Sequence, residues 1–193
     1  MFTNDELKAM ICREPISDQY PYPEQDDDLL EQSLQPLLDD MARANICYRV
    51  SSNHFGCGYA SYIQIVCWTD QFVKVKEEDG EREEDRRGLF VFISRLAPVA
   101  AIVNNAWQFA SFDETGEEIS CGGTMPTYPE LSIDKKYKQL ARDLSRLLMK
   151  HHFTLLQKKF VDKLLPFPAK IPTLDRESGT YLVWDAIFYW RDY

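Results

Sequence analysis

The chain has 193 residues, of which 45% are hydrophobic and 27% charged, and its formal net charge is -9 at pH 7. This length and composition fit one globular domain, residues 1–193, and argue against a chain that is disordered throughout. The opening segment is acidic and lacks the apolar core of a secretory signal, and no apolar run approaches the roughly 20 residues of a membrane helix. We therefore expect a cytoplasmic protein that has no membrane partner.

The cysteines favour the same compartment. They are odd in number, include no CxxC pair, and lie at Cys12, Cys47, Cys57, Cys67 and Cys121. This pattern does not predict a disulfide framework or a structural zinc site, and reduced thiols in a cytosol fit it better. The adjacent His151 and His152 diverge by about 100° on a helix, so they do not form the i, i+4 pair that metals favour. We expect no metal and no cofactor.

Charge is distributed unevenly along the chain. Residues 1–50 hold eleven acidic and four basic residues, a net of -7, whereas residues 134–170 hold ten basic and three acidic ones, a net of +7. Either the two regions face each other in the fold and partly compensate, or one of them forms a partner-binding surface of one sign. Because the overall acidity repels a polyanion, nucleic acid is a disfavoured partner.

Two helices are expected before the first strand. Thr3 and Glu6 have the spacing of a capping box, which predicts a short N-terminal helix. Tyr20-Pro21-Tyr22-Pro23 cannot be helical, and we interpret it as a connector, although such a segment also docks extended peptides. A second helix is expected from Glu24 to Ala44, with leucines on one face and with Pro36 either kinking it or beginning a new helix.

The next region alternates between apolar and polar residues, which predicts strands. These strands run over Ile46–Val50, Tyr59–Trp68 and Phe72–Lys76, and in the last of them Val73 and Val75 should face inward.

An acidic run and then an apolar stretch follow. Glu77–Gly88 contains no apolar residue, which predicts an exposed and mobile connection between strands. Leu89–Phe112 is almost free of charge, with Arg95 as the sole exception, and its β-branched and aromatic residues predict buried, paired strands at the centre of a sheet. The expected elements are strands at Leu89–Leu96 and Val99–Val103, separated at Ala97-Pro98, and a hairpin from Ala106 to Cys121 around Asp113–Gly116.

The C-terminal third is expected to be mostly helical. Tyr137–Leu148 carries the clearest helical face in the chain, and apolar residues over Leu156–Leu165 suggest a second helix. The aromatic segment Thr180–Tyr193 should dock against the body and complete the core, as a helix or as a strand. The expected fold class is α+β, with an antiparallel sheet of five or six strands flanked by N-terminal and C-terminal helices.

Candidate catalytic patterns are few. Cys57 lies between glycines three residues after His54, which would expose and activate a thiol if the two side chains met, but the glycines equally suit a hairpin turn. Cys121-Gly122-Gly123 does not match a phosphate-binding loop, and neither GxxxxGK[ST] nor GxGxxG occurs.

The segment Val183–Asp192, together with the order of helices, sheet, helices and aromatic tail, resembles the small immunity proteins of bacterial polymorphic toxin systems. Proteins of this kind bind and occlude a cognate toxin. The resemblance therefore implies a non-enzymatic protein without catalytic residues, in which an exposed acidic or aromatic surface does the binding.

We expect a basic protein partner, steered by the acidic run and held by aromatic residues outside the core. The predicted contact residues are Glu81, Glu83, Glu84, Asp85, Tyr20, Tyr22 and Trp68. Two alternatives stay open: a small cysteine-dependent enzyme that uses Cys57 or Cys121 with a histidine, and an adaptor subunit of a larger assembly. The oligomeric state is open as well.

Overall fold

A curled, almost wholly antiparallel sheet organises the structure, a computed structural model that describes residues 2–17, 27–51, 59–78, 80–124, 130–171, 177 and 179–191. The main path of this seven-stranded sheet runs β1 (Cys47–Ser51), β3 (Tyr62–Trp68), β5 (Glu81–Ser94), β6 (Val99–Phe112) and β7 (Glu118–Gly123). Two further strands are β4 (Val73–Glu78), which pairs with β5, and β8 (Thr154–Leu155), which is parallel to β6. A separate two-stranded sheet contains β2 (Tyr59–Ala60) and β9 (Trp190–Arg191).

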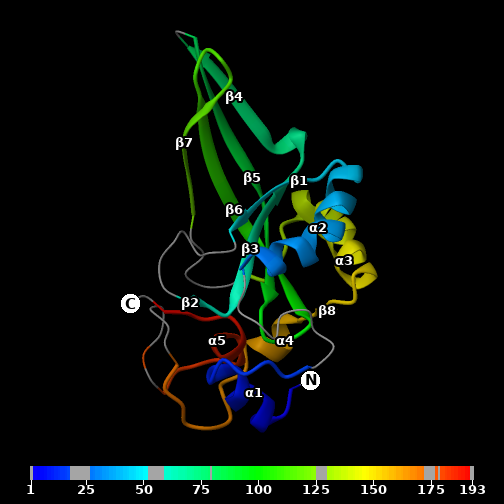
Figure 1. Cartoon of the computed structure of the whole chain (residues 1–193), viewed down its shortest axis with the longest axis vertical. Helices are drawn as coiled ribbons and strands as arrows, with labels where there is room; N and C mark the ends of the chain where they lie inside the picture. Colours follow the sequence, from blue (N-terminus) through cyan, green and yellow to red (C-terminus); the bar gives the residue numbers. More distant parts are fainter. Residues whose placement is uncertain are drawn as a thin grey trace.

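Helices from both ends of the chain flank the sheet, which confirms the α+β class (Figure 1). The helices are α1 (Asn4–Ile11), α2 (Asp27–Arg43), α3 (Lys138–Lys150), α4 (Lys158–Val161) and α5 (Val183–Ile187), and short 3-10 turns lie at η2 (Asp70–Phe72) and η3 (Lys135–Tyr137). No helix among the described residues combines the length and the apolar character needed to cross a membrane.

The predicted buried strands are confirmed, and each face of the β5–β6 hairpin is covered by its own hydrophobic cluster. Leu89, Val91 and Ile93 pack with residues of α2 and α3, whereas Phe90 and Phe92 pack with residues of α1 and α5. This alternation is the one expected when both faces of a strand pair are buried. The connection between β5 and β6 spans residues 95–98, so it contains the predicted break at Ala97-Pro98 and begins two residues earlier than expected.

The N-terminal helices largely match the expectations. The capping box of α1 is present: the Glu6 N–H donates to Thr3 Oγ1 at 3.2 Å, and the Thr3 N–H donates to Glu6 Oε2 at 2.7 Å. The two hydrogen bonds satisfy backbone donors that the helix itself leaves free. The second helix is one element with Pro36 inside it. Its buried residues are Leu34, Leu37, Leu38 and Met41.

Two expected strand boundaries and the expected orientation of one side chain differ from the structure. The strand expected over Tyr59–Trp68 is divided at Ser61, because Ser61 hydrogen-bonds the C-terminal segment through its N–H, which donates to Tyr189 O at 2.9 Å. The expected break near Ala106 does not occur, and β6 continues through a bulge at which Asn105 has a φ of 63°. Val75 was expected to face inward but is 49% exposed, because no cluster covers β4.

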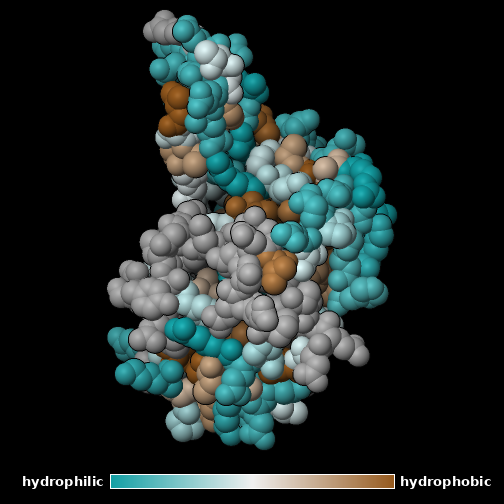
Figure 2. Space-filling model, in the orientation of Figure 1, coloured by the Kyte–Doolittle hydropathy of each residue, from teal (hydrophilic) through white to brown (hydrophobic). Residues whose placement is uncertain are grey.

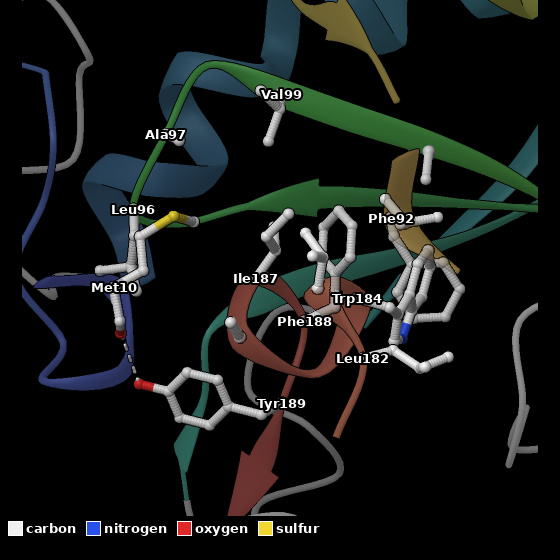
Figure 3. Close-up of a cluster of buried hydrophobic side chains, with 14 of the residues drawn as sticks. Met10, Phe92, Leu96, Ala97, Val99, Leu182, Trp184, Ile187, Phe188 and Tyr189 are labelled. Carbon is white, nitrogen blue, oxygen red and sulfur yellow. Dashed lines mark hydrogen bonds between the residues drawn. The ribbon is translucent and has the colours of Figure 1, made fainter. Parts of the chain in front are cut away.

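The C-terminal segment docks on the body as predicted. It forms both a short helix and a short strand, α5 and β9, and thus combines the two alternatives. Trp184 and Phe188 pack against Phe92, and Tyr189 reaches Met10 of α1 (Figure 3). The helix expected over Leu156–Leu165 is shorter than predicted, since only α4 is helical and Leu164 pairs with Leu182 in a β-bridge.

The acidic run is not a mobile connection. β4 ends at Glu78 and β5 begins at Glu81, so most of Glu77–Gly88 belongs to strands. Strand pairing places Lys76 opposite Glu83 and Glu77 opposite Arg82, and opposite charges across a strand pair stabilise it. Hydrophobic patterning does not detect such a strand, because charged residues occupy both of its faces.

Candidate functional site

A four-stranded projection stands clear of the body, and we call it the arm (residues 73–78, 80–88 and 106–123). It consists of β4, the first half of β5, the second half of β6, and β7 (Figure 1). The two hydrophobic clusters reach no farther along β5 than Leu89. Figure 2 shows mostly hydrophilic residues on the visible face of the arm, with a few hydrophobic ones among them.

The four predicted acidic contact residues all lie on β5, but they do not form one patch. Side chains alternate along a strand, so Glu84 lies on one face while Glu81, Glu83 and Asp85 lie on the other. The two faces of the arm therefore present different parts of the acidic run.

Arginines partly neutralise this run. Arg86 Nη2 lies 2.8 Å from Glu84 Oε2, and Arg82 pairs with the same carboxylate. On the other face, Arg87 Nε donates to Asp85 Oδ1 at 2.7 Å, and this hydrogen bond is the main reason that the pKa of Asp85 lies below its usual value. Glu81 and Glu83 are exposed, so they carry the accessible charge of the predicted set.

Arginines of β5 also stack on aromatic rings. The Arg86 guanidinium lies 4.9 Å from the Trp68 ring centroid, and Arg87 lies 5.4 Å from that of Trp107. Trp68 is only 7% exposed, in contrast to the expectation that it stays outside the core, and its role in binding stays a prediction. Tyr20 and Tyr22 lie outside the described residues.

An acidic hollow of about 620 Å³, which we call the tip hollow, lies at the end of the arm between its two hairpins. The acidic side chains around it include Glu77, Glu78 and Glu81 from one hairpin and Asp113 and Glu114 from the other; Arg82 and Phe112 line it as well. Sequence reasoning missed Glu77, Glu78 and Glu114 as site residues, because nothing local shows that the two hairpins end side by side.

Asp113 has a structural role in this hollow. Its Oδ1 accepts hydrogen bonds from the Thr115 side chain at 2.6 Å and from the Glu117 N–H at 2.9 Å. These contacts lower the pKa of Asp113, the Thr115 hydroxyl contributing most. They also fix the turn that the sequence predicted at Asp113–Gly116.

A second depression of about 390 Å³, the side groove, separates the two ends of the sheet's main path. Arg49, Val50 and Ser51 of β1 line one side, and Cys121, Gly122 and Gly123 of β7 line the other; Gln64, Val66, Trp107, Gln108 and Thr124 complete the lining.

The ends of the curled sheet are joined across this groove by Arg49, which forms an ion pair with Glu118. With its amide in the orientation that satisfies its hydrogen bonds, Gln108 also accepts from Arg49 Nη1 at 2.8 Å. The Glu118 carboxylate raises the pKa of Arg49, and Arg49 lowers the pKa of Glu118. Sequence reasoning missed this pair, whose members lie 69 residues apart.

The residues of the cysteine-enzyme alternative are not brought together by the described structure. Cys121 is exposed on β7 and interacts with Arg49 and Glu118, whereas His151 Nε2 lies 2.8 Å from Asp40 Oδ2 at the junction of α2 and α3. Cys57 and His54 lie outside the described residues. Among the residues described, no three His, Cys, Asp or Glu side chains are grouped to hold a metal ion.

The segment that carries the resemblance to immunity proteins contributes to the core. Residues 181–189 are buried, so in this structure they hold the fold together and present no binding surface. No protein-family model matches the chain, and neither the curated proteins nor the solved structures that were compared with it include a match.

Proposed function

We propose that this chain is a non-enzymatic binding protein that contacts a protein partner through the arm. The observation that carries the proposal is the length of β5 and β6, which have 14 residues each, whereas about 5–6 is usual. Of the arm's side chains, Ala106 alone belongs to either cluster, so the extra length forms a ribbon that extends beyond the core. A ribbon that adds so little to the core is explained by contact with another molecule.

The charge at the end of the arm specifies the chemistry of that partner. The carboxylates of Glu77, Glu78, Glu81 and Glu114 converge on the tip hollow from both hairpins. Such an arrangement attracts lysine and arginine side chains and raises the rate at which a basic protein associates. The partner is therefore basic.

The narrower form of the proposal is that the partner is a toxin, which this chain occludes when it binds. The resemblance of Val183–Asp192 to immunity proteins supports this form. A cytoplasmic setting is part of the same proposal, and it is supported by the free thiols of Cys12, Cys47, Cys67 and Cys121.

Co-purification with the protein encoded by the adjacent reading frame tests the proposal. We expect a stable complex, and we expect this chain to suppress any toxicity of that protein in cells. If no complex forms at micromolar concentrations, the assignment of a neighbouring toxin as the partner is wrong.

The role of the arm is tested in that complex by replacing four tip carboxylates with amides. At low salt the association rate constant should fall about tenfold while dissociation changes little, because exposed charges steer encounter more than they hold a complex. The replaced residues are Glu77, Glu78, Glu81 and Glu114, each changed to Gln.

A control removes the same number of negative charges from exposed positions on the body and should slow association much less. Its substitutions are Asp5→Asn, Glu14→Gln, Asp39→Asn and Glu177→Gln. Equal slowing by both variants would show that net charge alone, and not the arm, steers the partner.

A further inference from the structure

At the edge of β7 that faces away from β6, the described part of the chain places no further strand. Within the described strands, β7 pairs with β6 alone. The Thr124 N–H donates to Trp107 O at 3.0 Å, and hydrogen-bonded positions alternate along an antiparallel strand. The N–H and C=O groups of Cys121 and Gly123 therefore point away from β6, at the edge that lines the side groove.

This edge lacks the features that normally protect an exposed strand. Charged side chains and proline discourage the pairing of edge strands with other chains. β4, the other edge of the arm, carries four charged residues among its six, whereas β7 has no charge and no proline after Glu118. One edge of the arm is thus protected and the other is open.

Close packing against β6 keeps the open edge free of side chains. A Cβ at Gly122 would lie 2.3 Å from Phe109 Cε1, and a Cβ at Gly123 would lie 2.7 Å from Trp107 O. Neither position accepts a side chain without displacing its neighbour. The backbone at this end of β7 therefore stays accessible.

The direction of the strands fits one additional antiparallel strand. Each consecutive pair along the path β1-β3-β5-β6-β7 is antiparallel, so β1 and β7 run in the same direction. A strand antiparallel to β7 is then antiparallel to β1 as well. Val66 and Trp107 provide apolar surface in the groove for its side chains.

We propose that the side groove binds an extended segment of the protein partner, which adds to β7 as an antiparallel strand. Glu118, at the end of β7 nearer the tip, is already paired with Arg49, whereas Glu117 beside it is exposed and supplies the available negative charge. Charge complementarity therefore places a lysine or arginine at the C-terminal end of the segment, with apolar residues at alternate positions before it. The inference rests on the proposed function only in taking the partner to be a protein.

Six-residue synthetic peptides, the length of β7, test the inference. Val-Thr-Val-Thr-Val-Lys, blocked at both ends, should bind the parent chain more tightly than Lys-Val-Thr-Val-Thr-Val, because only the first brings its lysine to Glu117 when it is antiparallel to β7. It should also slow hydrogen exchange at the amides of Cys121 and Gly123. N-methylation of the peptide amides that face β7 should abolish both effects.

A proline variant tests the backbone pairing. Cys121→Pro removes a single N–H that points outward, which an edge strand tolerates, and it should weaken peptide binding about tenfold. Cys121→Ala keeps the N–H and should bind like the parent. Unchanged exchange at Gly123 with saturating peptide, or equal binding by the two variants, would overturn the inference.

Two further results separate this inference from its competitors. If the parent chain forms a dimer that Cys121→Pro dissociates, the occupant of the groove is a second copy and the proposed occupant is wrong. If the peptides fail to bind but the tip variant still slows association with the partner protein, the groove inference falls and the proposed function stands.

Discussion

The carboxylate of Asp40 joins the acidic region, residues 1–50, to the basic region, residues 134–170. Its Oδ2 accepts from Lys150 Nζ at 2.6 Å and lies 2.8 Å from His151 Nε2, and its Oδ1 accepts from Arg43 Nη1 at 2.6 Å. The Asp40 side chain is 7% exposed. The lysine and then the histidine lower the pKa of Asp40 to about 2. At this junction the two charge excesses compensate each other, as one of the two interpretations of the sequence requires.

Replacing Asp40 with Asn should lower the free energy of unfolding at neutral pH, because Arg43, Lys150 and His151 lose the carboxylate that they share. A carboxyl whose pKa is lowered by folding stabilises the protein above its unfolded pKa of about 4, and that contribution is lost as the pH falls towards 2. Denaturant titrations of parent and variant should therefore converge between pH 4 and pH 2. The control is the neighbouring Asp39→Asn, at an exposed position, whose free energy of unfolding should match that of the parent at every pH. If Asp40→Asn differs from the parent by the same free energy at pH 7 and at pH 2, this account of Asp40 is wrong.

At the scale of elements, the arm leaves the body at Gly88 of β5, where the backbone of β3 lies very close. A Cβ at Gly88 would lie 2.0 Å from Cys67 O and 3.2 Å from Trp68 Cα. Both neighbours belong to the backbone of β3, which cannot move aside as a flexible side chain would. Only glycine fits at this position.

Gly88→Ala should therefore destabilise the protein by about 2–3 kcal/mol, measured by urea unfolding, because the collision separates two paired strands. Gly116→Ala, in the turn at the far end of the arm, is the matched control. Its Cβ would meet nothing within 4 Å, so it should cost only the roughly 1 kcal/mol of a positive φ. Equal losses for the two variants would show that the close approach at Gly88 is relieved by a small backbone shift.

Elements that are specified by neighbouring residues could be predicted from the sequence, whereas elements that depend on pairing with distant strands could not. The capping box at Thr3 and the apolar face of α3 are local patterns, and the structure confirms both. The arm was missed because charged residues fill Glu77–Gly88, and what holds them in a strand is pairing with residues of β4 and β6. Pairing of this kind is set by register, which apolar periodicity does not reveal in a charged strand.

The candidate site was predictable to the same limited extent. Glu81 was identified from the acidic run and lines the tip hollow. Glu114 and the Arg49–Glu118 pair were not identified, because each is brought into place by a strand from elsewhere in the sequence. Composition thus indicated the sign of the surface charge, whereas the shape of the surface follows from contacts between distant strands.

At the scale of the whole molecule, the two ends of the chain are tied together beneath the sheet. The Tyr189 hydroxyl donates to Met10 O at 2.9 Å, with Ile11 O at 3.3 Å, and thereby binds the last turn of α1 (Figure 3). The Tyr189 N–H donates to Ser61 Oγ at 2.8 Å, which links the same residue to the start of β3. The aromatic C-terminal segment thus connects the first helix to the sheet that carries the arm.

Tyr189→Phe keeps the buried ring but removes the hydroxyl that donates to the Met10 carbonyl and lies near that of Ile11. The Met10 carbonyl keeps the Arg13 N–H as a donor. We expect the free energy of unfolding to fall by about 1–2 kcal/mol. Hydrogen exchange should also accelerate within α1, because the helix loses its tie to the body. Tyr181→Phe is the matched control: its hydroxyl donates to Ile171 O at 3.1 Å, so it should cost a similar amount without changing exchange in α1. If α1 exchanges at the parent rate in Tyr189→Phe, apolar packing alone holds the helix, and the hydroxyl does not tie the two ends of the chain together.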